Sequence, residues 1–231
     1  MLFRLLGEVT AEREDGGIVR LGGPQNRALL AILLLSAGRP VSVDRLIDLL
    51  WDEPPATARN RVQGLVAELR RAGVALATRA PGYAVATSPG QVDLFRFRAC
   101  VERARIAEPP TAVALLIEAL NWWRGPALAC VDLPVLAQSL EEERLHALES
   151  RIALELGLGR HGAVVPELAA LTSEHPTRES LHQLLMLAQY RCGRSADALE
   201  TYRRLSHRLA AEYGISSGPE LRRLQESILR G

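Results

Sequence analysis

Hydrophobic and polar positions change their pattern partway along this chain. In residues 1–90, short segments of alternating apolar and polar residues flank three segments whose apolar residues recur at helical spacing. From Asp93 onward the alternation disappears, and helical segments follow one another with Pro and Gly residues between them. This change predicts two domains, one over residues 1–90 and an all-α one over residues 91–231.

The N-terminal segments have the order of a winged helix-turn-helix. The predicted elements are, in order, strands over 3–9 and 18–21, helices over 25–36, 43–51 and 57–71, and hairpin strands over 74–78 and 83–87. Ser42 and Thr57 stand where the second and third helices need N-caps. In this fold the second and third helices dock on DNA. We therefore assign the reading helix to residues 57–72 and the wing to residues 74–87.

The helical part contains an internal repeat. Residues 158–165 (LGRHGAVV) align with residues 192–199 (CGRSADAL) at an offset of 34 residues, which is the period of tetratricopeptide repeats. Such a helical hairpin cannot cover its own apolar face and must stack on its neighbour. The predicted fold class is therefore mainly α with a small β component: a winged helix followed by a tetratricopeptide-like helical domain with a concave face suited to binding protein.

Composition and local charge add a candidate partner. The chain has 231 residues, of which 48% are apolar and 4% aromatic, and this excludes a disordered or collagen-like chain. Its formal net charge is only +1, and every residue of its Lys+Arg set is arginine. Residues 57–83, however, hold five arginines and a single acid, Glu68, for a net +4. A basic segment over the predicted reading helix and wing favours a nucleic-acid partner.

Cysteine spacing and hydropathy indicate no metal site, no disulfide framework and no membrane span. Cys100, Cys130 and Cys192 form no C-x-x-C pair and have no histidine at metal-ligand spacing, which fits a reducing cytosol. The apolar run at 28–37 is ten residues long and too short to span a bilayer. We expect a cytoplasmic protein with no membrane segment and no metal site.

Several motifs in both parts resemble the Streptomyces antibiotic regulatory proteins. They are LGGPQNRALLA from position 21, VSVDRLIDLLW from 41, PPATARN from 54, TRAPGY from 78, VDLFRF from 92, WRGPAL from 123 and GISSGPEL from 214. The resemblance covers essentially the whole chain. It implies an OmpR-type winged helix joined to a bacterial transcriptional activation domain.

The same resemblance implies a function. Members of this family are cytoplasmic, nucleoid-associated activators of secondary-metabolite gene clusters. They bind direct repeats in double-stranded promoter DNA, often as a pair of protomers, and recruit RNA polymerase holoenzyme. The resemblance implies neither catalysis nor a cofactor.

One face of the predicted reading helix carries the candidate DNA contacts. Val62, Leu65, Val66 and Leu69 fall together on the opposite face and are expected in the core. The candidates are Asn60, Arg61, Gln63, Gly64, Arg70 and Arg71. The two amides can each bond an adenine in two places, and the arginines can pair phosphates or guanine. The alternative is that these residues form only the solvated face of a helix.

Further contacts are expected from the wing and from the first two helices. Arg79, at the hairpin tip, corresponds to the wing arginine that OmpR-type domains place in or beside the minor groove, with Gly82 supplying the turn and Tyr83 packing under the hairpin. Phosphate contacts are expected from Arg27, Ser42 and Arg45 near the helix N-termini. Arg45 could instead pair with Asp44 or Asp48.

Four residues depart from the family pattern, Gly64, Leu65, Ala67 and Glu68, and two of them bear on affinity. Members usually have a larger residue where Gly64 stands and a basic residue where Glu68 stands. A mid-helix glycine costs about 1 kcal/mol relative to alanine, and a carboxylate facing phosphates repels them. The hypothesis is that DNA binding is weak in the isolated protomer and that a second protomer or the polymerase supplies the remaining affinity.

Two other interpretations stay open. The chain could be a scaffold or anti-activator whose winged helix no longer reads DNA, which Gly64 and Glu68 favour. An enzyme is less favoured, because the histidines all lie in the helical half, where His175 and His182 are expected at helix ends and on the surface.

Overall fold

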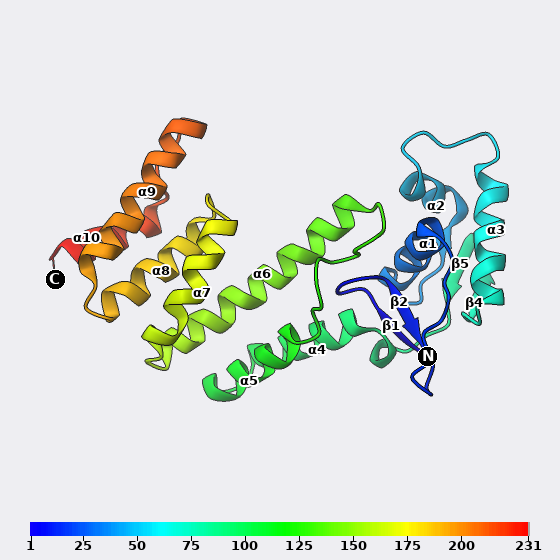
Figure 1. Ribbon diagram of the computed structural model, residues 1–231, viewed down its shortest axis with the longest axis horizontal. Coiled ribbons are helices and arrows are strands. Elements are labelled where there is room, and N and C mark those ends of the chain that lie inside the picture. Colours follow the sequence, from blue (N-terminus) through cyan, green and yellow to red (C-terminus); the bar gives the residue numbers. More distant parts are fainter. Residues whose placement is uncertain (231) are drawn as a thin grey trace. The chain divides into compact units, whose positions relative to one another are not determined.

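A computed structural model describes residues 1–230 and shows a mainly helical protein with a few short strands (Figure 1). The elements are β1 (Leu2–Arg4), β2 (Thr10–Glu12), α1 (Pro24–Leu35), β3 (Val41–Ser42), α2 (Val43–Leu50), α3 (Ala58–Arg71), β4 (Leu76–Arg79), β5 (Gly82–Val85), the short 3-10 helix η1 (Pro89–Gln91), α4 (Asp93–Arg105), α5 (Pro109–Leu120), α6 (Pro134–Gly157), α7 (His161–Glu174), α8 (Glu179–Arg191), α9 (Ser195–Tyr213) and α10 (Pro219–Arg230). This order confirms the predicted class, a winged helix followed by helices.

The first strands differ from the prediction. β1 pairs antiparallel with β2, with Phe3 opposite Ala11, whereas the expected strand over 18–21 contributes only an isolated bridge between Ile18 and Glu12. The predicted turn is present, because the Arg13 N–H donates to the carbonyl of Gly17 at 2.9 Å. β2 therefore takes the central place between β1 and the bridge.

The three helices of the winged helix form as expected, with one difference in capping. Ser42 caps α2, since its hydroxyl accepts the Arg45 N–H at 3.1 Å. Thr57 makes no side-chain cap bond, and its φ of −94° and ψ of 10° are not the extended geometry that such a cap needs. The predicted core residues of α3 are all buried.

A three-stranded sheet of order β3-β5-β4 completes this fold. The strands of the hairpin begin and end about two residues from the predicted positions, and the turn consists of residues 80 and 81. Arg79 is consequently the last residue of β4, paired with Gly82, rather than part of the turn.

The chain separates into two compact units, which are described one at a time. The first comprises Met1–Arg105 and Ile117–Leu145, and the second comprises Ile106–Leu116 and the chain from His146 onward. The first unit thus includes α4 as well as the winged helix. The domain division at residues 90 and 91 stays a prediction.

Asp93 ties three segments of the first unit together. Its carboxylate is almost fully buried, at 4% exposure, and it accepts the N–H groups of Leu5 at 2.8 Å and of Leu6 at 3.2 Å. It also accepts Arg124 Nη2 at 2.9 Å. The segment after β1, the start of α4 and the loop around residue 124 therefore converge on one buried charge.

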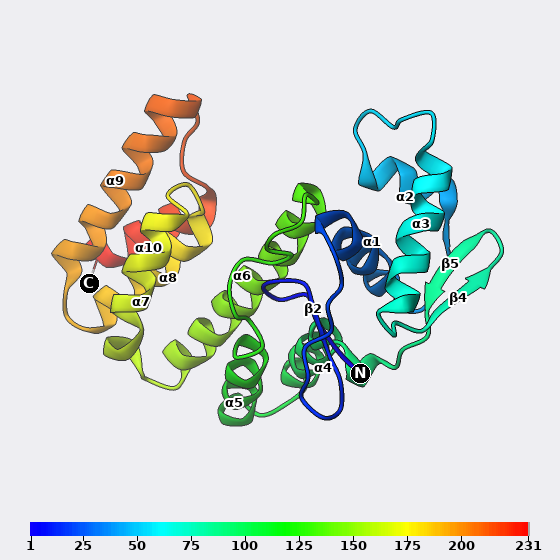
Figure 2. The same cartoon turned by 45° about the vertical axis from the view of Figure 1, so that its right-hand side comes forward.

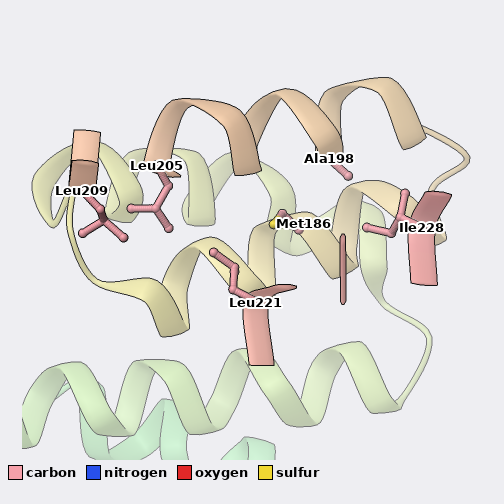
Figure 3. Close-up of a cluster of buried hydrophobic side chains, with 6 residues drawn as sticks. All are labelled: Met186, Ala198, Leu205, Leu209, Leu221 and Ile228. Atoms are coloured by element: carbon pink, nitrogen blue, oxygen red, sulfur yellow. The ribbon is translucent and has the colours of Figure 1, made fainter. Parts of the chain in front are cut away.

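The second unit shows the predicted repeat. α8 packs between α7 and α9, and the glycines that precede α7 and α9, Gly159 and Gly193, have φ of +81° and +75° (Figure 2). These two glycines are at equivalent positions of the repeat, and a left-handed residue ends a helix there. α10 closes the stack through Leu221 and Ile228, which lie in a buried cluster with Met186, Ala198, Leu205 and Leu209 (Figure 3).

We expect replacement of Asp93 by alanine to lower the free energy of unfolding by about 3 kcal/mol, because it leaves two buried backbone N–H groups and the guanidinium of Arg124 without their acceptor. Urea denaturation would measure the change. Replacement of the exposed Asp132 by alanine is the control and should change stability by less than about 0.5 kcal/mol. Equal effects of the two substitutions would contradict the role given to Asp93.

Candidate DNA-binding surface

α3 lies between α2 and the β4–β5 hairpin and exposes a polar face (Figure 2). Its apolar stripe is buried, while Asn60, Gln63, Gly64 and Ala67 on the opposite side are all exposed. Neither amide side chain has a hydrogen-bond partner among the described residues. Both amides are therefore available to an outside partner.

Four of the predicted arginines are exposed and unpaired. Arg45, Arg61, Arg71 and Arg79 make no side-chain hydrogen bond or ion pair with any residue in 1–230. Asp44, considered above as a partner for Arg45, pairs with Arg59 at 2.5 Å instead. These four guanidinium groups keep their full set of donors for phosphate or guanine.

Two other predicted arginines already have partners inside the protein. The Arg70 guanidinium donates to the carbonyl of Leu76 at 3.0 Å and to the Thr78 hydroxyl at 2.8 Å, and it lies 5.8 Å from the ring centre of Tyr83. Arg27 forms an ion pair with Glu8. Arg70 thus fastens α3 to β4 while Tyr83 packs beneath it; its charge has no carboxylate partner, but two of its donors are already used, whereas the charge of Arg27 is paired.

Glu68 does not stand as an unpaired carboxylate. Its Oε2 accepts the Asn26 side-chain amide at 2.9 Å, and Asn26 is 4% exposed near the start of α1. Gly22 makes room for this contact, because a Cβ there would lie 3.0 Å from the Asn26 Oδ1. This bond was not predicted from the sequence; it gives Glu68 a role in holding α3 to α1 and leaves the charge of its carboxylate in place.

The two glycines of the candidate site differ in their surroundings. A Cβ at Gly64 would meet nothing within 4 Å, so this residue is not required by packing. A Cβ at Gly82 would overlap the carbonyl oxygen of Val41, at 1.8 Å. Gly82 is therefore needed for the close approach of β5 to β3, and not for the turn as predicted.

Within residues 1–230, no group of three or more His, Cys, Asp or Glu side chains is placed to hold a metal ion. The prediction for His182 is wrong, because this histidine is buried at 8% exposure and its Nε2 lies 3.2 Å from the carbonyl oxygen of Pro176. No helix of the described chain is both long and apolar enough to cross a membrane.

Comparison with known protein families shows to which family the chain belongs. A model described as "Bacterial transcriptional activator domain" matches residues 92–229, and one described as "Transcriptional regulatory protein, C terminal" matches residues 19–83. The chain belongs to the Streptomyces antibiotic regulatory protein family of transcriptional regulators.

Individual relatives agree with this assignment. The chain is 43% identical over 240 residues to the regulatory protein AfsR of Streptomyces coelicolor, spanning 99% of this chain and 24% of AfsR. It is 33% identical to the regulatory protein DnrI of Streptomyces peucetius, spanning 100% of this chain and 92% of DnrI. It spans 63% of the transcriptional regulatory protein EmbR of Mycobacterium tuberculosis at 40% identity. The chain thus covers less than two thirds of AfsR and of EmbR.

A solved structure shares the fold. Mycobacterium tuberculosis EmbR in complex with a low affinity phosphopeptide has a TM-score of 0.90 to this chain at 39% identity. The match covers 99% of this chain and 65% of that one.

Substitution of the two glycines should change stability in opposite directions. Gly82→Ala should lower the free energy of unfolding by about 3 kcal/mol, because its Cβ has no room beside β3. Gly64→Ala should raise it by about 1 kcal/mol, because its Cβ enters open space in an exposed helix. Thermal denaturation of both variants checks this, and a Gly82→Ala protein as stable as the native chain would rule out the close approach.

The bond between Asn26 and Glu68 should appear as a coupling energy. In a double-mutant cycle of Asn26→Ala and Glu68→Ala, we expect the two effects on unfolding to be non-additive by about 1 kcal/mol, as for an intramolecular hydrogen bond. Glu53→Ala, which changes an exposed acid in the loop before α3, is the matched control and should be additive with Asn26→Ala. Additivity of the Glu68 pair would mean that the contact does not stabilise α3.

Proposed function

We propose that this protein is a DNA-binding transcriptional activator, specific to the pathway of one secondary-metabolite gene cluster. It binds direct repeats in double-stranded promoter DNA through helix 57–72 and wing 74–87, and it recruits RNA polymerase holoenzyme through its helical part. The observation that carries the proposal is the exposed amide face of α3 with four unpaired arginines around it.

The chemistry of this face suits a major groove. Asn60 and Gln63 can each make a bidentate contact with adenine, a kind of contact worth about 1–3 kcal/mol of discrimination. Arg61 and Arg71 lie ten residues apart on α3, which is about 15 Å along a helix axis and enough to reach separate phosphates. In this proposal Arg79, at the end of β4, makes the minor-groove contact of a wing.

The number of arginines without an internal partner supports a modest affinity of one protomer for DNA. Because Arg27 and Arg70 are held internally, fewer arginines remain for phosphates than the sequence offers. Phosphate contacts dominate non-specific affinity. We therefore propose that two protomers bind adjacent repeats, as a homodimer on DNA, and that the polymerase adds further affinity.

The second part of the proposal concerns the helical region. The family model over residues 92–229 is that of a transcriptional activator domain, and stacked helical repeats build extended surfaces that bind protein. RNA polymerase is the partner that activation requires. In this proposal the protein acts in the cytoplasm, on the nucleoid, and performs no catalysis.

The rival interpretation is a scaffold whose winged helix no longer binds DNA. It relied on Glu68 and Gly64. Glu68 keeps its negative charge although it is hydrogen-bonded to Asn26, but Gly64 adjoins free amides and the four unpaired arginines outnumber this one carboxylate, and this supports DNA contact over the scaffold.

Alanine replacement of Asn60 and Arg79 tests DNA reading. On a promoter fragment first found by chromatin immunoprecipitation, we expect the double variant to bind at least about tenfold more weakly in an electrophoretic shift, since one base contact and one groove contact are lost. Arg105→Ala removes an exposed arginine from α4 and should bind as the native protein does.

Unchanged promoter binding by the Asn60 and Arg79 variant, with activity kept, would favour the scaffold. Nanomolar binding by the isolated native monomer at moderate salt would contradict the need for a second protomer.

A further inference from the structure

The second compact unit contains a cavity of about 780 Å³ between α7 and α9. Small side chains on α7, Ala169 and Ser173, form one wall, and His182 and Leu185 of α8 lie on the floor. The volume is that of a ligand site rather than a packing defect. The cavity lies between the second helices of the two repeat hairpins, away from the DNA-reading helix in the chain.

The α9 wall is positively charged at its centre. Arg203, Arg204 and Arg208 line the cavity with only two carboxylates, Glu200 and Glu212, at the two ends of the row. Glu200 is shared by Arg203 at 3.5 Å and Arg204 at 3.3 Å, and Glu212 is 3.4 Å from Arg208. Two carboxylates therefore serve three guanidinium groups, through exposed pairs on one helix that exchange readily for an outside carboxylate.

The side of the cavity that α8 lines is uncharged. His182 Nε2–H donates to the Pro176 carbonyl, and its Nδ1 is covered by the protein. Burial, the main cause, lowers the pKa of His182, and the nearby Arg208 lowers it further. A neutral histidine together with Leu185 and Leu205 makes this side of the cavity suited to an apolar side chain.

We propose that this cavity binds an acidic segment of a partner protein, with carboxylates on Arg204 and Arg208 and a small apolar side chain over Leu185. The two arginines are one helical turn apart, about 5–6 Å, and alternate residues of an extended chain are about 6.6 Å apart. A segment with two acids at alternate positions therefore matches both arginines. This inference rests on the proposed function, in that it names the chemistry of the partner that the helical region contacts.

The charge pattern favours peptide over nucleic acid. Glu200 and Glu212 bound the cationic row at both ends, so a phosphate backbone that continued past the cavity would meet a carboxylate on each side. The α7 wall adds no arginine to grip a second phosphate strand. A short acidic segment avoids both obstacles.

A fluorescein-labelled peptide with two glutamates flanking a leucine, and its glutamine counterpart, test this on the full chain by fluorescence polarisation. We expect the glutamate peptide to bind at low salt and to bind about tenfold more weakly to Arg204→Gln/Arg208→Gln. Arg222→Gln/Arg223→Gln removes the same charge from α10 and should bind within about twofold of native. Ala169→Trp should fill the cavity and weaken peptide binding without any change of charge. If the Ala169→Trp protein unfolds, Ser173→Phe is the alternative substitution that fills the cavity.

Three results would overturn the proposal. Equal weakening by the two arginine pairs would mean that only net charge matters, and equal binding of the glutamine peptide would exclude carboxylate recognition. A short DNA duplex could also displace the peptide from the native chain but not from the Arg222→Gln/Arg223→Gln variant. That result would place the binding site on α10 and make DNA its ligand. The assay contains neither promoter DNA nor polymerase. A negative result would therefore not contradict the DNA-binding proposal, which the electrophoretic shift tests separately.

Discussion

The recognition surface depends on how α3 is held at both of its flanks. On one flank Glu68 accepts the buried amide of Asn26, and on the other Arg70 binds the carbonyl of Leu76 and the hydroxyl of Thr78. Between them the apolar stripe is buried against α1 and α2. A helix held on three sides can expose only one face, and that face carries Asn60. Glu68 and Arg70 thus orient the helix, and under the proposed function the arginines without internal partners bind DNA.

The same division between structural and free charges runs through the whole chain. The buried carboxylate of Asp93 joins the segment after β1 and the loop around Arg124 to the start of α4, while Arg61, Arg71 and Arg79 stay unpaired. A net charge of +1 therefore says little about partners. What matters is which guanidinium groups have an internal carboxylate or carbonyl, and this is decided by tertiary contacts.

Local patterns predicted a large part of this structure. The 3.6-residue periodicity identified Val62 and Leu69 as core, the hydroxyl of Ser42 marked the start of α2, and the offset of 34 residues predicted the stacked hairpins. Contacts between distant segments could not be predicted, because nothing local links Asn26 to Glu68, 42 positions later, or Arg27 to Glu8. Gly82 was assigned to the turn for the same reason, since its neighbour Val41 comes from another strand.

The salt dependence of binding to a random-sequence duplex tests the central claim, that the arginines left unpaired by the fold are those that meet DNA. Each lost phosphate contact lowers the slope of log K against log salt by about 0.9. Joint replacement of Arg61, Arg71 and Arg79 by glutamine should therefore reduce the slope by about 3, whereas Arg27→Gln should leave it unchanged. An unchanged slope in the triple variant, or an equal loss for Arg27→Gln, would contradict the account.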